Sequence, residues 1–428
     1  MSPALALLLT ILSPVADAPR ALPGTTWIKD PSLFAALDEK VAQLQVPPGS
    51  SVRDIASALN SISNGELERA RALFDWIAGH MAYDDDAVAK RSFERDPAVL
   101  AATLRSDCGG FARLFHAVGK EMGLTIHEVG GVIRSLQPPA EIFISDSKQF
   151  VKGQWLVSHV WNTVKIGDAT GLLDCTAACT RSITNGKLTD RARINEEFFL
   201  PEPGAFATRY IPDESKYGLV DHLPVATALA GLPIVYPIAS RTGLDPAALQ
   251  PAMSDSGPFK RLVFKGFGSV GAWSQLTSEG STVNRSTLSQ SDGKDLVVWI
   301  APPAGPSCLN IWWMDSKGKE RIVASYPIGL NTASPKLPTI YKIFGESRSE
   351  LSEPIAGELK ADEPVTFRIR IPGADSAGLI CNDQPVVHLQ RNGDWFFGRG
   401  TVPQGKVCVC AQFGGKSYWH GLLLYDVR

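Results

Sequence analysis

The sequence predicts an α+β chain in which a catalytic region of helices and antiparallel strands precedes two β-sandwich modules. Apolar residues recur at three- and four-residue steps between residues 33 and 123, which indicates amphipathic helices. Strand-like segments follow up to residue 176, and helices followed by strands are typical of an α+β layout. From about residue 225, short strands alternate with Gly, Pro, Asn and Asp, which favours sandwich modules.

The first helices are predicted at residues 33–44, 51–62 and 64–84. In the third segment a single apolar stripe is formed by Leu67, Ala70, Phe74, Ile77 and Met81. Asn64 precedes this stripe and is a suitable N-cap, because its side chain can accept from the first helical turn. The stripe predicts a helix that packs on the core of the catalytic region.

The clearest predicted helix begins at Cys108. Its buried face is expected to consist of Phe111, Leu114, Phe115, Val118 and Met122. Asp107 or Ser106 can cap the start, and Gly123 stands where a left-handed residue commonly ends a helix. The pattern therefore predicts both ends of this helix as well as its buried face.

Three strands are predicted after this helix, at residues 125–136, 154–167 and 170–176. A turn at 167–171 joins the last two, so these two strands are expected to lie antiparallel. The predicted turn therefore brings the end of the third strand close to the middle of the second.

Changes in sequence texture suggest the domain boundaries. A catalytic domain is predicted at 25–222, a first sandwich module at 225–332 and a second at 336–428. The boundary between the modules is placed in the Pro-containing segment 329–338. Residues 365–371 alternate between apolar and polar side chains, which is typical of a half-buried strand in such a module.

Cys108, His159 and Asp174 have the residue types and surroundings of a thiol acyl-transfer site. A cysteine nucleophile needs a base to take its proton, and the base needs a third group to fix its tautomer. Cys108 opens a helix, and a helix N-terminus stabilises a thiolate and can donate to an oxyanion. His159 and Asp174 lie on neighbouring predicted strands, so the carboxylate can accept from the second ring nitrogen. No cofactor or metal is predicted.

Each of these residues also has a purely structural explanation. A lone cysteine at a helix start is usually a small buried residue, and an Asp near a turn is often a cap. Their joint occurrence in this order favours chemistry. A zinc site built from Cys175, Cys179 and His159 is the rival chemistry, but it lacks paired Cys-x-x-Cys spacing. A catalytically silent adhesion or scaffold protein is a further alternative.

A secretory signal peptide is predicted at residues 1–18. The apolar run from Ala4 to Val15 is too short to span a bilayer, and Ala16-Asp17-Ala18 has the form of a cleavage site. We therefore expect a secreted or periplasmic protein with no integral membrane span. The six cysteines besides Cys108 could pair in such a compartment. The net charge of −2 gives no electrostatic reason to expect a nucleic acid partner.

Residues 65–217 resemble the transglutaminase-like superfamily, which shares a papain-type Cys-His-Asp arrangement. The family's nucleophile helix is similar to DCGGFARLFHAVGKEMGL, its histidine strand to HVWNTVKIG and its aspartate strand to LLDCT. The resemblance implies a papain-like catalytic domain followed by Ig-like β-sandwich modules. It also implies that Cys108 is the nucleophile, His159 the base and Asp174 the residue that orients the base.

The segment FFLPEPGAFATRYIPDESKYGLV resembles the kyphoscoliosis-peptidase-like branch of that superfamily. Two departures stand out, Cys179 and the pair Tyr210-Ile211, and neither is expected to touch the three site residues. The resemblance implies a cysteine-dependent peptidase or amidase that acts on protein or peptide amides. A protein cross-linking transglutaminase is the alternative within the same chemistry.

Overall fold

The structure is a computed structural model, which describes residues 31–136, 148–151, 154–190, 194–220, 229, 231–242, 249, 253–269, 271–314, 318–330 and 333–428. The chain forms two compact units, Met1–Arg241 and Thr242–Arg428. The predicted signal peptide, residues 1–18, lies outside the described residues. The predicted domain boundaries at 222–225 and 332–336 stay predictions. Within the described ranges, no helix has the length and apolar character needed to cross a membrane.

The long helices of the first unit lie where the sequence predicts them. They are α3 (Ala35–Gln43), α4 (Val52–Asn60), α5 (Gly65–His80) and α8 (Cys108–Glu121). Four short helices are additional to the prediction, namely α6 (Asp85–Ala89), α7 (Pro97–Thr103), α9 (Cys175–Ala178) and α10 (Pro203–Ala207). Asn64 does not cap α5 with its side chain; instead its backbone N–H donates to Glu68 Oε2 at 2.8 Å.

Helix α8 has the predicted start, end and buried face. The Asp107 carboxylate accepts from the Gly110 N–H at 3.1 Å, which satisfies one of the free donors of the first turn. Gly123 follows the helix at φ +81°, in the left-handed region. The predicted apolar face is buried in the core of the first unit, together with Leu73, Phe74 and Trp76 of α5.

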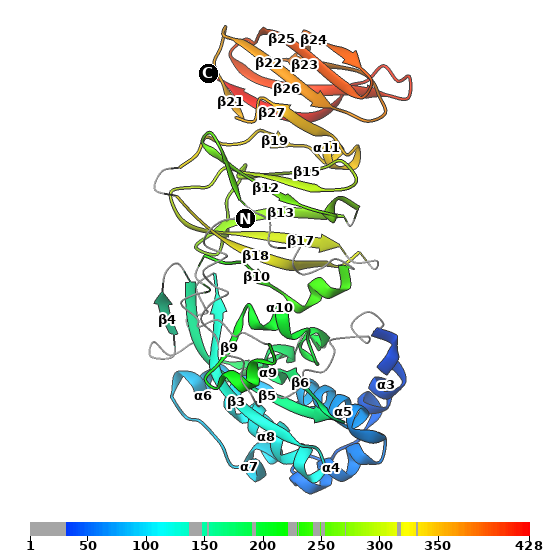
Figure 1. Ribbon diagram of the computed structural model, residues 1–428, viewed down its shortest axis with the longest axis vertical. Helices are drawn as coiled ribbons and strands as arrows, with labels where there is room; N and C mark the ends of the chain where they lie inside the picture. The colour runs from blue at the N-terminus through cyan, green and yellow to red at the C-terminus, as the bar shows by residue number, and fades with distance from the viewer. Residues whose placement is uncertain are drawn as a thin grey trace. The chain divides into compact units, whose positions relative to one another are not determined.

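Helix α8 packs against one antiparallel sheet of the first unit (Figure 1). Its strands are β3 (Ile126–Ser135), β4 (Lys148–Val151), β5 (Gln154–Ile166), β6 (Ala169–Leu173) and β9 (Tyr210–Pro212). Strand β5 pairs with β3 on one edge and with β4 and β6 on the other, and β9 extends the sheet beyond β3. In this register His159 lies opposite Gly131, which in turn lies opposite Pro212.

The helix and the sheet are joined by a buried amide. Asn162 of β5 donates from Nδ2 to the carbonyl of Ala112 in α8 at 3.1 Å and to the carbonyl of His127 at 3.3 Å. Asn162 is 1% exposed, so this contact is shielded from water. Because a buried polar side chain is costly to leave unpaired, these bonds fix the position of α8 over the sheet.

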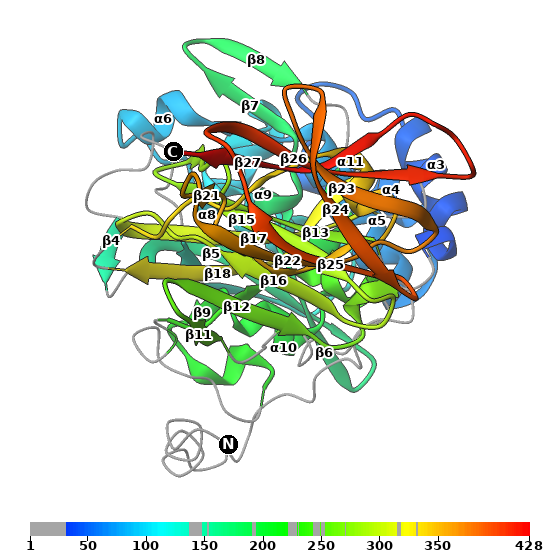
Figure 2. The ribbon, with the colours of Figure 1, turned by 90° about the horizontal axis from the view of Figure 1, so that it is seen from above.

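A second, smaller sheet of the first unit has the order β2-β1-β7-β8. It consists of β1 (Ala82–Asp84), β2 (Arg105–Ser106), β7 (Arg181–Thr184) and β8 (Lys187–Asp190). Strands β7 and β8 form a hairpin (Figure 2). The parallel pairing of β1 with β2 places Tyr83 opposite Ser106, two residues before the start of α8.

The second unit contains the two predicted β modules. The first has two sheets, whose strands are β11 (Ser254–Ser256), β12 (Phe259–Phe264), β13 (Ala272–Ser278), β14 (Ser281–Thr282), β15 (Thr287–Ser291), β16 (Leu296–Ile300), β17 (Gly305–Met314) and β18 (Glu320–Leu330). One sheet contains the run β18-β17-β13-β14 and the other has the order β11-β12-β16-β15. This arrangement is the sandwich that the regular spacing of turns predicts.

The second module, over the described residues 339–427, is built from nine strands and a short helix α11 (Lys342–Glu346). The strands are β19 (Thr339–Ile340), β20 (Glu350–Glu353), β21 (Glu358–Leu359), β22 (Pro364–Arg370), β23 (Ala374–Cys381), β24 (Gln384–Asn392), β25 (Trp395–Thr401), β26 (Gly405–Phe413) and β27 (His420–Val427). Strand β15 of the first module packs against β20. The predicted alternation in β22 is confirmed, because Phe367 and Ile369 are both 1% exposed.

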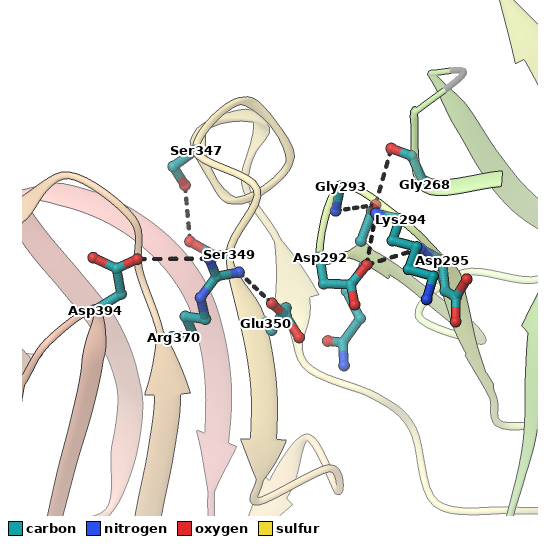
Figure 3. A network of polar contacts seen from close by, with 12 residues as sticks. Gly268, Asp292, Gly293, Lys294, Asp295, Ser347, Ser349, Glu350, Arg370 and Asp394 are labelled. Carbon is teal, nitrogen blue, oxygen red and sulfur yellow. Dashed lines mark hydrogen bonds and ion pairs between the residues drawn. The ribbon is translucent and has the colours of Figure 1, made fainter. Parts of the chain in front are cut away.

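The two modules share apolar and polar contacts and form one compact unit. Phe259 and Leu288 of the first module belong to the apolar core of the second. The Gln290 side chain donates to the Leu351 carbonyl at 3.1 Å and accepts from the Leu351 N–H at 2.9 Å. Close to this joint, the Arg370 guanidinium lies between Glu350 and Asp394 (Figure 3).

Candidate active site

Cys108 lines a cleft of about 380 Å³ in the first unit. His159 lines the same cleft, together with Tyr83, Phe93, Arg95, Asp107, the strand β3 glycines Gly130 and Gly131, and Asp213. Cys108 is half-buried at the first position of α8, and His159 is 9% exposed on β5. The thiol and the imidazole predicted from sequence therefore meet in one cleft.

The imidazole of His159 has a partner on each side. Its Nε2 lies 2.7 Å from Oδ2 of Asp174, which is 1% exposed. The Cys108 side chain lies close enough on the cleft side to raise the pKa of the imidazole. Since Nε2 faces Asp174, Nδ1 is the nitrogen left for the thiol. The structure thus brings the three predicted residues together in the order Cys108, His159, Asp174.

The surroundings of His159 favour its charged form. Burial by itself would lower the pKa of His159, but the charge of Asp174, then the charge of Cys108 and hydrogen bonds to both, raise it to about 10. Burial acts in the opposite direction on Asp174, yet the His159 charge and hydrogen bonds from its neighbours hold the pKa of Asp174 below its usual range. An imidazolium next to a carboxylate is therefore the favoured state of this pair near neutral pH.

Asp174 reaches His159 from a helix start, and not from within a strand as the sequence predicts. Strand β6 ends at Leu173, and Asp174 is the N-cap of α9, where its Oδ1 accepts from the Ala177 N–H at 3.0 Å. The expected antiparallel pairing of β5 and β6 is confirmed, with Asn162 opposite Leu173. The cap function and the contact with His159 are thus both performed by the same carboxylate.

Tyr210 is a site residue that the sequence analysis missed. Its hydroxyl donates to Asp174 Oδ2 at 2.9 Å, so the expectation that this departure does not touch the three residues is wrong. The contact depends on the pairing of β9 with β3, which places Tyr210 opposite Ile133. No local pattern around residue 210 indicates this contact, because it joins positions separated by 36 residues.

Arg95 and Asp107 form an ion pair next to the nucleophile. Arg95 Nη2 donates to Asp107 Oδ2 at 2.7 Å, and Arg95 Nη1 lies 2.7 Å from Asp107 Oδ1. The guanidinium also packs against the first turn of α8, since a β-carbon on Gly109 would lie 2.6 Å from Arg95 Nη2. Gly109 is therefore needed for this close approach, and the pair offsets the negative charge of the Asp107 cap beside Cys108.

Cys175 and Cys179, the cysteines of the alternative zinc site, do not form a metal-binding group with His159. Cys175 is 3% exposed, and the Cys179 thiol points to the Met81 carbonyl, with Sγ 2.9 Å from its oxygen. Across the described ranges, no group of three His, Cys, Asp or Glu side chains has the arrangement to hold a metal ion. All seven cysteines are described, and each is an unpaired thiol.

The arrangement of these groups matches the requirements of thiol acyl transfer. A thiol at a helix N-terminus, a charged imidazole beside it and a fixed carboxylate are the three parts of a cysteine nucleophile with its base. The sequence profile of the Transglutaminase-like superfamily matches residues 53–171. The chain carries a transglutaminase-like domain.

Two curated relatives support the kyphoscoliosis-peptidase-like branch of this superfamily. Kyphoscoliosis peptidase from Mus musculus is 28% identical over 193 residues, which is 45% of this chain and 27% of the mouse protein. Kyphoscoliosis peptidase from Homo sapiens is 27% identical over 179 residues, which is 41% of this chain and 25% of the human protein. The match thus spans about a quarter of the length of these relatives.

Solved transglutaminase structures are also similar to the chain. A TGase crystal structure is 18% identical, with a TM-score of 0.22, over 39% of this chain and 37% of that chain. Red sea bream transglutaminase is 10% identical, with a TM-score of 0.23, over 88% of this chain and 73% of that chain. The family assignment itself rests on the sequence matches.

Proposed function

We propose that this transglutaminase-like domain is a cysteine-dependent acyl-transfer enzyme acting on protein or peptide amides. Cys108 is the nucleophile, His159 the general base and acid, and Asp174 the residue that orients His159. The observation that carries the proposal is that Cys108 and His159 line one cleft, while the buried Asp174 carboxylate is bonded to the imidazole.

The first half-reaction forms a thioester. The Cys108 thiolate attacks the amide carbonyl carbon, and the carbonyl π electrons move to oxygen, where the backbone N–H at the start of α8 can stabilise the oxyanion. The C–N bond then breaks as His159 gives its Nδ1 proton to the leaving amine. Asp174 holds Nε2–H throughout, so the ring presents the same nitrogen to the thiol and to the leaving group.

The second half-reaction resolves the thioester. His159 takes a proton from water, the hydroxyl oxygen attacks the carbonyl carbon, and the C–S bond breaks to return the Cys108 thiolate and release an acid. An amine in place of water would give a new amide by the same steps. We propose hydrolysis as the main outcome, which is consistent with the relatives being named as peptidases.

We further propose that the enzyme works outside the cytoplasm. The support is the apolar run from Ala4 to Val15 and the cleavage-site pattern that follows it.

Thiol reactivity tests the proposed nucleophile without knowledge of the substrate. We expect iodoacetamide to alkylate Cys108 rapidly at pH 6, where an ordinary thiol with a pKa of about 8.5 is mostly protonated. The His159→Gln variant should lose this reactivity at pH 6 by roughly tenfold or more. Cys179→Ser is the matched control, because it removes another half-buried thiol outside the cleft. Slow alkylation of wild-type Cys108, at the rate of an ordinary thiol, would contradict the proposal.

Products distinguish hydrolysis from transfer. Proteins from the native host are incubated with wild type or with Cys108→Ala, and new chain termini and isopeptide cross-links are sought by mass spectrometry. Products that appear only with wild type identify the reaction. New termini support the proposed hydrolysis, whereas cross-links without new termini would replace it by amine transfer.

A further inference from the structure

Tyr210 and Asp174 form a buried hydrogen bond directly behind the imidazole of His159. The Tyr210 hydroxyl donates to Asp174 Oδ2 at 2.9 Å, and these residues are 3% and 1% exposed. The same oxygen is the partner of His159 Nε2 at 2.7 Å. The hydroxyl therefore binds the oxygen that orients the base.

The ring that carries this hydroxyl has little freedom to move. Phe206 of α10 stacks on it, with ring centroids 3.8 Å apart and planes 15° apart. Trp161 meets it nearly edge-on, with centroids 5.4 Å apart at 84°. The backbone of Tyr210 is paired with Ile133 in the sheet. A side chain fixed by packing on several sides pays little further entropy to hold one hydrogen bond.

Asp174 accepts three hydrogen bonds in this arrangement. The Ala177 N–H binds Oδ1, while His159 and Tyr210 bind Oδ2. The Ala177 bond fixes one oxygen of the carboxylate at the start of α9. Tyr210 binds the other oxygen, so rotation of the carboxylate that would carry Oδ2 away from His159 breaks a second bond as well.

We propose that Tyr210 is a positioning residue of the active site, which keeps Asp174 charged and directed at His159. The inference rests on the proposed function, because it concerns the same nucleophile and base. Without the hydroxyl, the buried Oδ2 loses a donor, and the charged carboxylate is less well stabilised. The imidazolium that depends on this charge is then less favoured, and so is the thiolate beside it.

The charged and titratable groups around Tyr210 are consistent with this function. Besides Asp174 and His159, the Arg209 guanidinium lies 5.8 Å from the Tyr210 ring centroid, and Cys108 also contributes to the field at the hydroxyl. Burial, followed by the charge of Asp174, raises the pKa of Tyr210 well above its ordinary value. The hydroxyl consequently keeps its proton and remains a donor over the range in which the enzyme can be assayed.

The test is the pH profile of Cys108 alkylation by iodoacetamide in the full chain, from pH 5.5 to 9. For Tyr210→Phe we expect a fall of roughly tenfold at pH 6, the size expected for one hydrogen bond to a charged group. At pH 9 the rate should approach that of wild type, because the thiolate then forms without help from the imidazolium. Tyr425→Phe is the matched control, since Tyr425 is fully buried and donates to the Pro354 carbonyl at 3.0 Å in the other unit.

A double-mutant cycle shows whether Tyr210 acts through Asp174. In an Asp174→Asn background, the additional change Tyr210→Phe should alter the rate less than twofold, because the partner is already lost. Additive effects in this cycle would overturn the inference, and so would a wild-type pH profile in Tyr210→Phe. If Tyr210→Phe is insoluble, Phe206→Leu replaces it, since that change loosens the ring and should lower the rate at pH 6.

These outcomes separate the inference from the proposed function. If wild-type Cys108 already reacts like an ordinary thiol, both the proposed function and this inference are refuted. If wild type reacts rapidly at pH 6 and Tyr210→Phe reacts equally rapidly, the function stands and the positioning by Tyr210 is refuted.

Discussion

Replacement of His159 by Gln should remove a pH-dependent part of the stability of the first unit. The pKa of His159 is raised to about 10 in the folded protein, against a reference value of 6.5. A group with a raised folded pKa contributes stability that is fully present below its unfolded pKa. That stability is lost as the pH rises through the folded pKa. The contribution of His159 should therefore be complete at pH 6 and should disappear between about pH 6.5 and 10.

The structure sets an upper limit on this contribution. A difference of about 3.5 pH units corresponds to about 5 kcal/mol at 1.36 kcal/mol per unit. Part of the difference comes from Cys108, so the loss should be smaller in a Cys108→Ala background, where Asp174 alone acts on His159. Asp174 does not titrate in this window, because its pKa is lowered and it remains charged throughout.

The measurement is the free energy of unfolding of the first unit in urea, at intervals from pH 5.5 to 9.5. The difference in unfolding free energy between wild type and His159→Gln should be largest at pH 5.5 and should shrink steadily toward pH 9.5. His80→Gln is a control, because burial lowers the pKa of His80, which is the opposite direction from His159. The difference in unfolding free energy between wild type and His80→Gln should therefore stay constant above pH 6.5. A His159→Gln gap that is equal at pH 5.5 and 9.5 would refute the assignment of His159 as a charged, Asp174-bound imidazole.

Three further predictions concern other parts of the chain. Arg95→Ala should slow Cys108 alkylation at pH 6 about fivefold at low salt, because the unpaired Asp107 charge then opposes the thiolate, and Arg95→Lys should restore part of the rate. Gln290→Ala should destabilise the second unit by about 1–3 kcal/mol in urea unfolding, whereas Gln275→Ala, which removes only a solvent-exposed bond to Thr282, should not. Protein from the native host should lack at least the first ~18 residues by intact-mass analysis, and a full-length species would contradict export.

The sequence predicts well those parts of the fold that depend on local patterns. Helix α8 is an example, because its cap Asp107, its apolar face and its terminal Gly123 all act within a few residues of one another. The pairing of β5 with β6 is similarly local, since a tight turn joins the two strands. The second of these predictions brings the end of β6 next to the strand of His159, whereas the position of Asp174 at the start of α9 is not predicted.

The parts that the sequence does not predict depend on distant contacts. Tyr210 reaches Asp174 only because β9 returns to pair with β3, and β-strand pairing at long range leaves no periodic signal in either segment. The pair Arg95 and Asp107 likewise joins a loop to a helix start across 12 residues. The shared core of the two β modules has the same origin, since Phe259 and Leu288 look like ordinary sandwich residues in sequence.

Asp174 shows why the structural and the catalytic explanations of a residue need not compete. A carboxylate at a helix start is stabilised by the N–H groups of the first turn, which hold it charged and in place. These are also the conditions under which it best orients an imidazole. Replacing Asp174 by Asn keeps an oxygen that can cap α9 but removes the charge that supports the His159 imidazolium. The variant should therefore retain α9 while losing rapid alkylation of Cys108 at pH 6, and this separation distinguishes the two functions of the side chain.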